Sequence, residues 1–298
     1  MGRFDGVLLA SDFDNTLIYT EDALLRGEPL PPLPERNRQA LTYFMAEGGR
    51  FAISTGRALA AFEKYAPLVP MNAPGVICNG AALYDFARNE YLFSALLDES
   101  ARQRGQLVLD RFPQAAVEAY HIDNVIHAVH PNEITRHHEH LTKVAVTEMP
   151  SLLDVPLPLG KLLFEASHET LEQIRAFLLD QGWGGDYELI FSGQNLLEMT
   201  AKGANKGGMV RRLAEHLGIG LDHLYCVGDE ANDLPMLRLA AEGFAPANCI
   251  PAVRESGATI PCPARAGALP DVEEHWEKKY HRDATHYQRF RRFHARYL

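Results

Sequence analysis

Hydrophobic and polar positions in the first part of the chain predict strands that alternate with helices. Three short apolar runs have the length of buried strands: Val7–Ser11, Phe51–Ser54 and Val76–Cys78. Between the first two, Glu35–Ala46 carries apolar residues at helical spacing and stops before a Gly-Gly pair. This alternation predicts a parallel sheet whose strands are joined by right-handed crossovers.

The same alternation returns towards the C-terminal end. Helices are predicted at Asn205–Leu217 and Leu234–Ala241, and each is followed by a short apolar run, at Leu224–Val227 and Phe244–Pro246. These elements have the character of the first part, so we expect them to complete the same parallel sheet.

The middle of the chain, from about Leu83 to Phe191, has a different pattern. It predicts two helices and five strands, at Ser100–Phe112, Ala115–Tyr120, Asn124–Val129, Lys143–Thr147, Lys161–Glu165, Glu169–Leu179 and Tyr187–Phe191. Several strands in close succession favour an inserted α+β domain with an antiparallel sheet. We therefore expect a core domain at residues 1–82 and 194–270 that is interrupted by an insert at residues 83–193.

The connection Asn15–Pro34 is unusually long and holds four prolines, all within Pro29–Pro34. A loop of about 20 residues without regular structure is uncommon and is often functional. We expect this segment to be a structureless flap.

Composition and charge exclude several classes of protein. The 46% apolar content is typical of globular domains, and the excess of 39 acidic over 29 basic residues argues against a dedicated nucleic-acid binder. No run approaches the roughly 18 apolar residues of a membrane span, and the N-terminus lacks the pattern of a secretory signal. The four cysteines form no C-x-x-C pair. We expect a cytoplasmic protein that binds neither membrane nor nucleic acid.

The first candidate motif is Asp12-Phe13-Asp14-Asn15-Thr16, directly after the first predicted strand. Ligands of open α/β sheets bind at this carboxyl edge. A carboxylate such as Asp12 can attack phosphorus, and a second one at Asp14 can protonate the leaving oxygen and then activate water. An equally open interpretation of this motif alone is a pair of loop or helix-capping aspartates.

The second motif, Gly228–Asp233, also follows a strand and supplies Asp229, Asn232 and Asp233. Mg²⁺ prefers oxygen ligands and usually takes one or two carboxylates together with substrate phosphate and water. The alternative is a loop that caps the next helix.

Two weaker motifs complete the set. Ser54-Thr55-Gly56-Arg57 ends the second strand, and its hydroxyl and backbone N–H groups can hold phosphoryl oxygens, although such turns are common. Lys206 opens a helix and can neutralise a nucleophile and a phosphoryl group, although most lysines are simply solvated. No Ser or Thr follows this lysine, so the segment is not a Walker loop.

Taken together and in this order, the four motifs resemble those of the haloacid dehalogenase superfamily, specifically its Cof-like phosphatase branch. The resemblance runs from Val7 to about Ala258, and it covers the insert only by position and size. It implies an α/β fold in which a Rossmann-like, doubly wound parallel sheet carries an inserted α+β cap domain. Asn15 departs from the Gly that this branch most often has there.

The resemblance implies a role for each matching residue. Asp12 is the expected nucleophile, Asp14 the general acid and base, and Thr55 and Lys206 complete the catalytic set, with Lys202 the less favoured lysine. The expected phosphate-binding residues are Asn15, Thr55, Gly56, Arg57, Asn79, Lys206 and Asn232. The expected Mg²⁺ ligands and supporting contacts are Asp12, Asp14 through its backbone carbonyl, Asp229 and Asp233.

The implied function is a Mg²⁺-dependent phosphatase that hydrolyses small phosphorylated metabolites through a phospho-aspartyl intermediate. A phosphomutase of sugar phosphates would use the same chemistry. A non-catalytic regulator that binds a phosphorylated ligand is the alternative of another class, and the completeness of all four motifs disfavours it.

Six of the thirteen histidines fall within the insert, at His121, His127, His130, His137, His138 and His140. One interpretation is a metal site. We favour a polar cap surface with some substrate-facing imidazoles, because the spacing fits no compact ligand set and the acids that a metal site needs nearby are few.

The tail Lys278–Leu298 carries seven Lys or Arg and one acid, a formal charge of +6, whereas the rest of the chain carries −16. Its aromatic residues recur at helical spacing. We expect a helix over residues 271–298 that docks on the core domain or forms a homodimer contact. The alternative is a helix that binds a membrane surface or nucleic acid.

Overall fold

A four-stranded parallel sheet forms the centre of the core domain in this computed structural model, which describes residues 2–121, 124–257 and 263–272. Its strands lie in the order β13-β12-β1-β2. Their bounds are β1 (Leu8–Ser11), β2 (Arg50–Ile53), β12 (Leu224–Val227) and β13 (Glu242–Phe244). The predicted parallel sheet is therefore confirmed, and β1, which precedes the first motif, lies at its centre.

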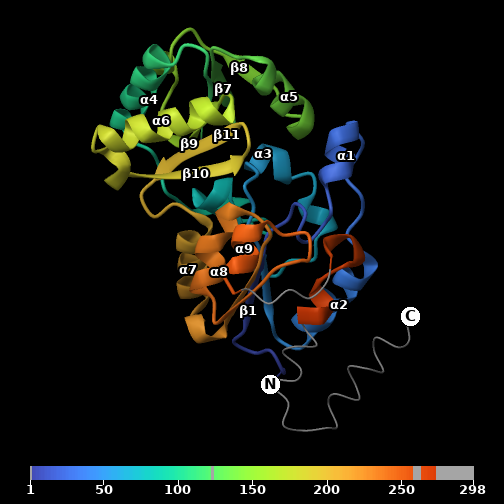
Figure 1. Ribbon diagram of the computed structural model, residues 1–298. Coiled ribbons are helices and arrows are strands. Elements are labelled where there is room, and N and C mark those ends of the chain that lie inside the picture. The colour runs from blue at the N-terminus through green and yellow to red at the C-terminus, as the bar shows by residue number, and fades with distance from the viewer. Residues whose placement is uncertain (1, 122–123, 258–262, 273–298) are drawn as a thin grey trace.

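Helices cover both faces of this sheet, as Figure 1 shows for α2 on one side of β1 and for α7 and α8 on the other. Side chains alternate along β1, so Leu9 packs in one apolar cluster with Phe44 of α2, and Leu8 packs in another with Met209 of α7. The helices are α2 (Glu35–Ala46), α7 (Lys206–Leu217) and α8 (Leu234–Leu239). The fold is thus the doubly wound α/β class that the sequence predicts.

The core sheet is extended by a hairpin that the sequence pattern did not reveal. Ser54 pairs with Val76 in a parallel bridge, which places β3 beside β2. Two antiparallel strands then follow β3, so the second sheet has the order β3 (Gly75–Ile77), β4 (Ala82–Asp85) and β5 (Glu90–Ser94). The expected boundary near residue 83 therefore falls inside this sheet.

The inserted cap domain is built on a six-stranded sheet, which lies above the core in Figure 1. All neighbouring pairs are antiparallel except β7 and β8, so the α+β character of the insert is confirmed. The sheet order is β10 (Tyr187–Gly193), β11 (Leu196–Ala201), β9 (Leu159–Glu165), β6 (Ala116–His121), β7 (Ile126–Val129) and β8 (Val146–Glu148). Because β11 belongs to this sheet, the expected boundary at residue 193 divides a hairpin.

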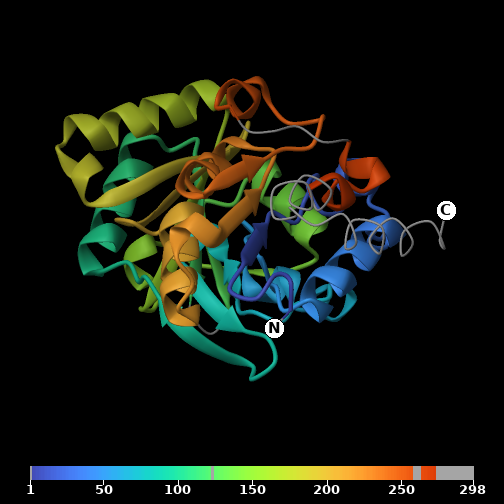
Figure 2. The same cartoon turned by 90° about the horizontal axis from the view of Figure 1, so that it is seen from below.

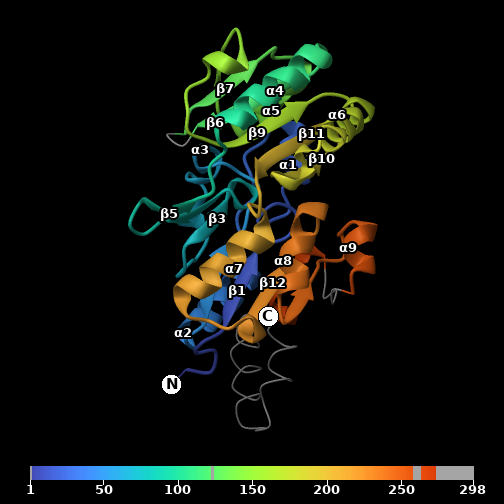
Figure 3. The same cartoon turned by 90° about the vertical axis from the view of Figure 1, so that its left-hand side faces the viewer.

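One face of the cap sheet is covered by two helices, α4 (Glu99–Arg111) and α6 (His168–Asp180) (Figure 3). Their apolar residues pack with Val117 and Phe164 of the sheet in one cluster. On the other face, Tyr120 and Leu163 pack with Ala58 of the core. The polar and charged side chains of that face therefore point towards the core domain.

Four α-helices of the described part of the chain were not predicted. Helix α5 (Glu133–Thr142) begins at Asn132, whose side chain accepts hydrogen bonds from the first turn. Helix α1 (Glu21–Arg26) lies in the segment expected to be structureless, so that expectation is wrong for this part. The Asn15 side chain accepts hydrogen bonds from the backbone N–H groups of Thr20 and Glu21 and so fixes the start of α1.

The other two helices that were not predicted are short, α3 (Leu59–Phe62) and α9 (Pro251–Glu255). In Figure 2 the cap and the core are seen from below, with α2 and α7 on opposite sides of the core sheet. None of the helices among the described residues is long and apolar enough to cross a membrane. The predicted helix at 271–298 lies outside the described residues from position 273 onward.

Candidate active site

Asp12 and Lys206 come together at the carboxyl end of β1, although 194 positions separate them in the chain. Lys206 is the first residue of α7, and its Nζ donates to Asp12 Oδ1 at 2.6 Å and to Asp233 Oδ1 at 2.6 Å. All three side chains are buried. Lys202 instead pairs with Glu188 at an exposed position, so Lys206 is the lysine that faces the candidate nucleophile.

Three carboxylates form an acidic cluster around this lysine. One ligand oxygen from each of Asp12, Asp229 and Asp233 lies within 4.8 Å of the other two. Thr16 Oγ1 donates to Asp229 Oδ1 at 2.6 Å, and Asp233 Oδ2 accepts from the backbone N–H groups of Asp229 and Glu230. These hydrogen bonds hold the acids in place.

Burial and mutual repulsion disfavour the ionised form of these three carboxylates unless a further positive charge is present. Burial raises the pKa of Asp12 to about 7 against the lowering effect of Lys206. Burial, with the charges of Asp12 and Asp233, raises the pKa of Asp229 to about 9. The donor set is made of oxygen atoms alone, which is what a hard divalent cation such as Mg²⁺ prefers. The residues present therefore fit a Mg²⁺ site.

The side chain of Asp14 is turned away from this cluster and pairs with Arg57. The guanidinium donates two hydrogen bonds of 2.7 Å to the two carboxylate oxygens, and Thr20 Oγ1 donates a third at 2.8 Å. Burial alone would raise the pKa of Asp14, but Arg57 and Thr20 outweigh it and hold the pKa below its usual value. In this arrangement Asp14 is a carboxylate and has no proton to give.

The residues expected to bind phosphate gather beside the acids. Thr55 is fully buried, and its hydroxyl oxygen accepts from the Arg57 backbone N–H at 3.2 Å. Asn232 Nδ2 donates to Asn79 Oδ1 at 2.9 Å, which joins the second motif to the end of β3. A Cβ on Gly56 would lie 3.1 Å from the Asn79 amide, so the absence of a side chain permits this close approach.

A cavity of about 330 Å³ lies between the core and the cap. Its core wall includes seven of the predicted residues: Asp12, Asp14, Asn15, Gly56, Arg57, Asn79 and Asn232. The other four predicted residues, Thr55, Lys206, Asp229 and Asp233, are buried and do not line it. The cap wall includes Tyr120, Ile126, His138, Lys161, Leu163, Ser192 and Glu198.

Two charged cap residues in this wall were not singled out from the sequence. Lys161 and Glu198 are both buried and form an ion pair of 3.1 Å. Lys161 Nζ also lies 4.4 Å from the ring centre of Tyr120 and donates to the backbone oxygen of Gly56 at 3.4 Å. The sequence did contain a signal for Lys161, because a lysine inside a mostly apolar strand such as Leu159–Glu165 is rarely buried without a specific partner.

The cap histidines do not share one environment. His130, His137 and His140 are exposed, as the polar-surface interpretation expects. His138 is different, because two buried acids, Glu118 and Glu165, lie beside it. The expectation that few acids lie nearby is therefore wrong, since distant strands supply them.

The doubly wound core, the inserted cap and the buried acids at the carboxyl end of β1 define a capped α/β enzyme. The chain belongs to the haloacid dehalogenase-like hydrolases, whose family pattern matches residues 9–260.

Two curated relatives are similar over most of the chain. A 5-amino-6-(5-phospho-D-ribitylamino)uracil phosphatase, YitU of Bacillus subtilis, is 25% identical, and the match covers 83% of this chain and 89% of the relative. An HMP-PP phosphatase of Cronobacter sakazakii is 25% identical, with coverage of 81% and 84%. Among solved structures, BT1666 from Bacteroides thetaiotaomicron, a phosphatase of the HAD superfamily, superposes with a TM-score of 0.77 at 17% identity, covering 92% of this chain and 96% of its own.

The Asp14–Arg57 pair makes stability depend on pH. Because the folded-state pKa of Asp14 is lowered, the pair contributes stability above the unfolded pKa of an aspartate, and this contribution is lost as pH falls through the folded pKa. We expect the free energy of unfolding of Arg57→Met to fall below that of the wild type at pH 7 and the difference to shrink towards pH 3. Urea titrations of both proteins across this range test it, and a difference that is independent of pH would contradict it.

Proposed function

We propose that this protein is a Mg²⁺-dependent phosphatase that hydrolyses small phosphorylated metabolites through a phospho-aspartyl intermediate. The observation that carries the proposal is the buried Asp12 carboxylate, held by Lys206 at the cavity floor, with a second acid two residues later. The two relatives, which are named as phosphatases of small phosphorylated molecules, support it.

In the first step Asp12 would attack phosphorus. Lys206 holds Oδ1, which leaves Oδ2 as the attacking atom. The bond from phosphorus to the leaving oxygen breaks as the acyl-phosphate forms, and Asp14 gives that oxygen a proton. In the second step Asp14 takes a proton from water, the water oxygen bonds to phosphorus, and Asp12 is released together with inorganic phosphate.

Asp14 must exchange its partner before it can act as an acid, because Arg57 keeps it ionised in the present arrangement. A bound phosphate group would compete for the Arg57 guanidinium, which forms bidentate contacts with phosphate as readily as with carboxylate. Substrate binding would thereby release the acid. This assigns Arg57 the role of coupling substrate arrival to the protonation of Asp14.

The surrounding residues would hold the transferring group. Thr55 and Lys206 would contact its oxygens, and Asp12, Asp229 and the backbone carbonyl of Asp14 would hold Mg²⁺, with Asp233 in support. A bound Mg²⁺ supplies neutralisation of phosphoryl charge. The cap would exclude water during the first step. Its buried Lys161 and Glu198 favour a substrate whose leaving group is polar.

Turnover of p-nitrophenyl phosphate with and without Mg²⁺ tests the chemistry, and phosphate release from a panel of phosphorylated metabolites tests the substrate class. We expect Mg²⁺-dependent release of free phosphate. Conversion of a sugar 1-phosphate to the 6-phosphate without free phosphate would show a phosphomutase. If no compound of the panel is turned over, the result would favour a non-catalytic regulator that binds a phosphorylated ligand.

The metal assignment predicts the behaviour of Asp229→Asn. The substitution keeps the side-chain size but removes one of the few carboxylate ligands, so the Mg²⁺ concentration for half-maximal activity should rise at least about tenfold. A Mg²⁺ titration of activity measures it, with the exposed Asp222→Asn as the matched control. An unchanged Mg²⁺ titration would contradict the assignment of Asp229 as a metal ligand.

A further inference from the structure

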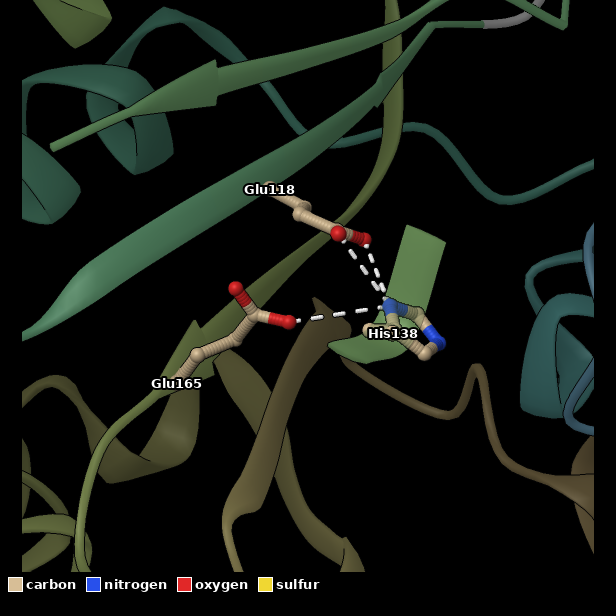
Figure 4. Close-up of side chains that lie close together, drawn as sticks. All are labelled: Glu118, His138 and Glu165. Atoms are coloured by element: carbon tan, nitrogen blue, oxygen red, sulfur yellow. Dashed lines mark hydrogen bonds and ion pairs between the residues drawn. The ribbon is translucent and has the colours of Figure 1, made fainter. Parts of the chain in front are cut away.

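Three side chains from separate elements of the cap converge on one point, as Figure 4 shows. They are Glu118 of β6, His138 of α5 and Glu165 of β9, and one ligand atom from each lies within 4.8 Å of the other two. Glu118 and Glu165 are buried, and His138 also lines the cavity above Asp12. We call these three residues the cap triad.

The two carboxylates of the cap triad are oriented by hydroxyl groups. Tyr120 donates its hydroxyl hydrogen to Glu118 Oε2 at 2.6 Å, and Thr135 donates to Glu165 Oε2. Both oxygens of Glu118 and the Oε1 oxygen of Glu165 face His138 Nδ1. Metal ligands are commonly held by hydrogen bonds of this kind, which fix the direction of the remaining lone pairs.

The Oε1 oxygen of Glu165 is a buried acceptor that the described hydrogen bonds leave unsatisfied. The atom is fully buried and has no hydrogen-bond partner among the residues that the structure describes, although it points towards His138 in Figure 4. A buried carboxylate oxygen without a partner is costly. His138 Nδ1, which faces this oxygen, lies 3.6 Å away, within the range of an ion pair but too far for a hydrogen bond.

The spacing of the cap triad fits an ion at its centre. His138 Nδ1 lies 3.0 Å from Glu118 Oε2, 3.1 Å from Glu118 Oε1 and 3.6 Å from Glu165 Oε1. Ligands about 2.0–2.1 Å from a tetrahedral Zn²⁺ are about 3.3 Å apart. Only small shifts would place all three ligands around one ion.

We propose that the cap triad binds a divalent transition-metal ion of the Zn²⁺ type through Glu118, His138 Nδ1 and Glu165. A neutral imidazole and two carboxylates balance a charge of +2, and the imidazole favours Zn²⁺ over Mg²⁺, which prefers oxygen ligands. The ion would connect α5 to strands β6 and β9 and would hold His138 in its position in the cavity wall. This site is separate from the acidic cluster at Asp12, so it does not depend on the proposed function.

Zn²⁺ binding by the purified full-length protein tests the proposal. Equilibrium dialysis against Zn²⁺ is carried out in excess Mg²⁺, which competes at the core acids, and bound metal is counted by elemental analysis. We expect the wild type to retain about one Zn²⁺ more than His138→Ala and Glu165→Gln. His137→Ala is the matched control, since His137 is the exposed neighbour on the same helix, and it should retain the wild-type amount.

Co²⁺ substitution adds a readout that activity does not influence. The visible absorption of protein-bound Co²⁺ should be present in the wild type and in His137→Ala and absent from His138→Ala. Glu165→Gln keeps the side-chain volume and an oxygen for the Thr135 hydroxyl, so it serves if His138→Ala does not fold. The proposal is overturned if the wild type and both triad variants retain the same amount of Zn²⁺, which includes the case that none of them retains any. The cap triad would then be a protonated His138 between two acids.

Discussion

Asp12→Asn is expected to lower kcat by at least about 1,000-fold, which corresponds to about 4 kcal/mol of activation free energy. An amide oxygen is a poor nucleophile and cannot form the acyl-phosphate. The fold should persist, because Asn has nearly the same shape and Lys206 keeps its 2.6 Å bond to Asp233. Loss of one negative charge from a crowded acidic cluster should also leave the metal-free protein no less stable.

Single-turnover and steady-state kinetics on the best panel substrate measure this effect, and circular dichroism verifies the fold. Asp180→Asn, an exposed aspartate at the end of α6, is the control and should keep the wild-type kcat. Retention of more than about a tenth of the wild-type kcat by Asp12→Asn, a loss below about 1.4 kcal/mol, would be too small for a covalent role.

Lys206→Met should be the most destabilising single change in the core site. It leaves Asp12 and Asp233 buried without the cation that lies 2.6 Å from each. Removal of one partner from a buried ion pair costs about 3–5 kcal/mol, so the urea midpoint of the metal-free protein should fall sharply. Activity should be lost as well, because the phosphoryl charge is no longer neutralised.

Lys202→Met is the matched control, since Lys202 is mostly exposed and pairs with Glu188 across 3.2 Å. Surface pairs of this kind contribute about 0–1 kcal/mol, so this variant should unfold close to the wild-type midpoint. Similar urea midpoints for the two lysine variants would show that Lys206 does not balance the acids.

Sequence pattern alone predicted the core where local signals agreed. Helix α2 and strand β12 have the predicted bounds, because an apolar run or helical spacing is closed by a clear polar or glycine signal at each end. Three of the four motifs were found for the same reason, since each directly follows a buried strand, and the lysine motif was found because it opens a predicted helix. Their order along the chain then led to the resemblance, which the family match over residues 9–260 bears out.

The elements that were missed have weaker local signals. Strand β11 carries Glu198 in its centre, and α5 holds few apolar residues, so neither stood out as an apolar segment. The hairpin β4–β5 was assigned to the insert because its pairing partner, β3, cannot be known from its own residues. In each case a tertiary contact compensates for what the local sequence lacks.

The sequence by itself determined the fold class, the acids at the carboxyl end of β1 and the lysine that opens α7. Only the tertiary structure decided which groups meet: Asp14 with Arg57, Lys161 with Glu198, and His138 with two glutamates from different strands. The physical reason is that side-chain type and spacing report on neighbours along the chain, whereas these pairs depend on strand order, register and the closing of the cap onto the core. Buried charge is favourable only where such packing supplies a partner, and the packing of the whole chain determines that partner.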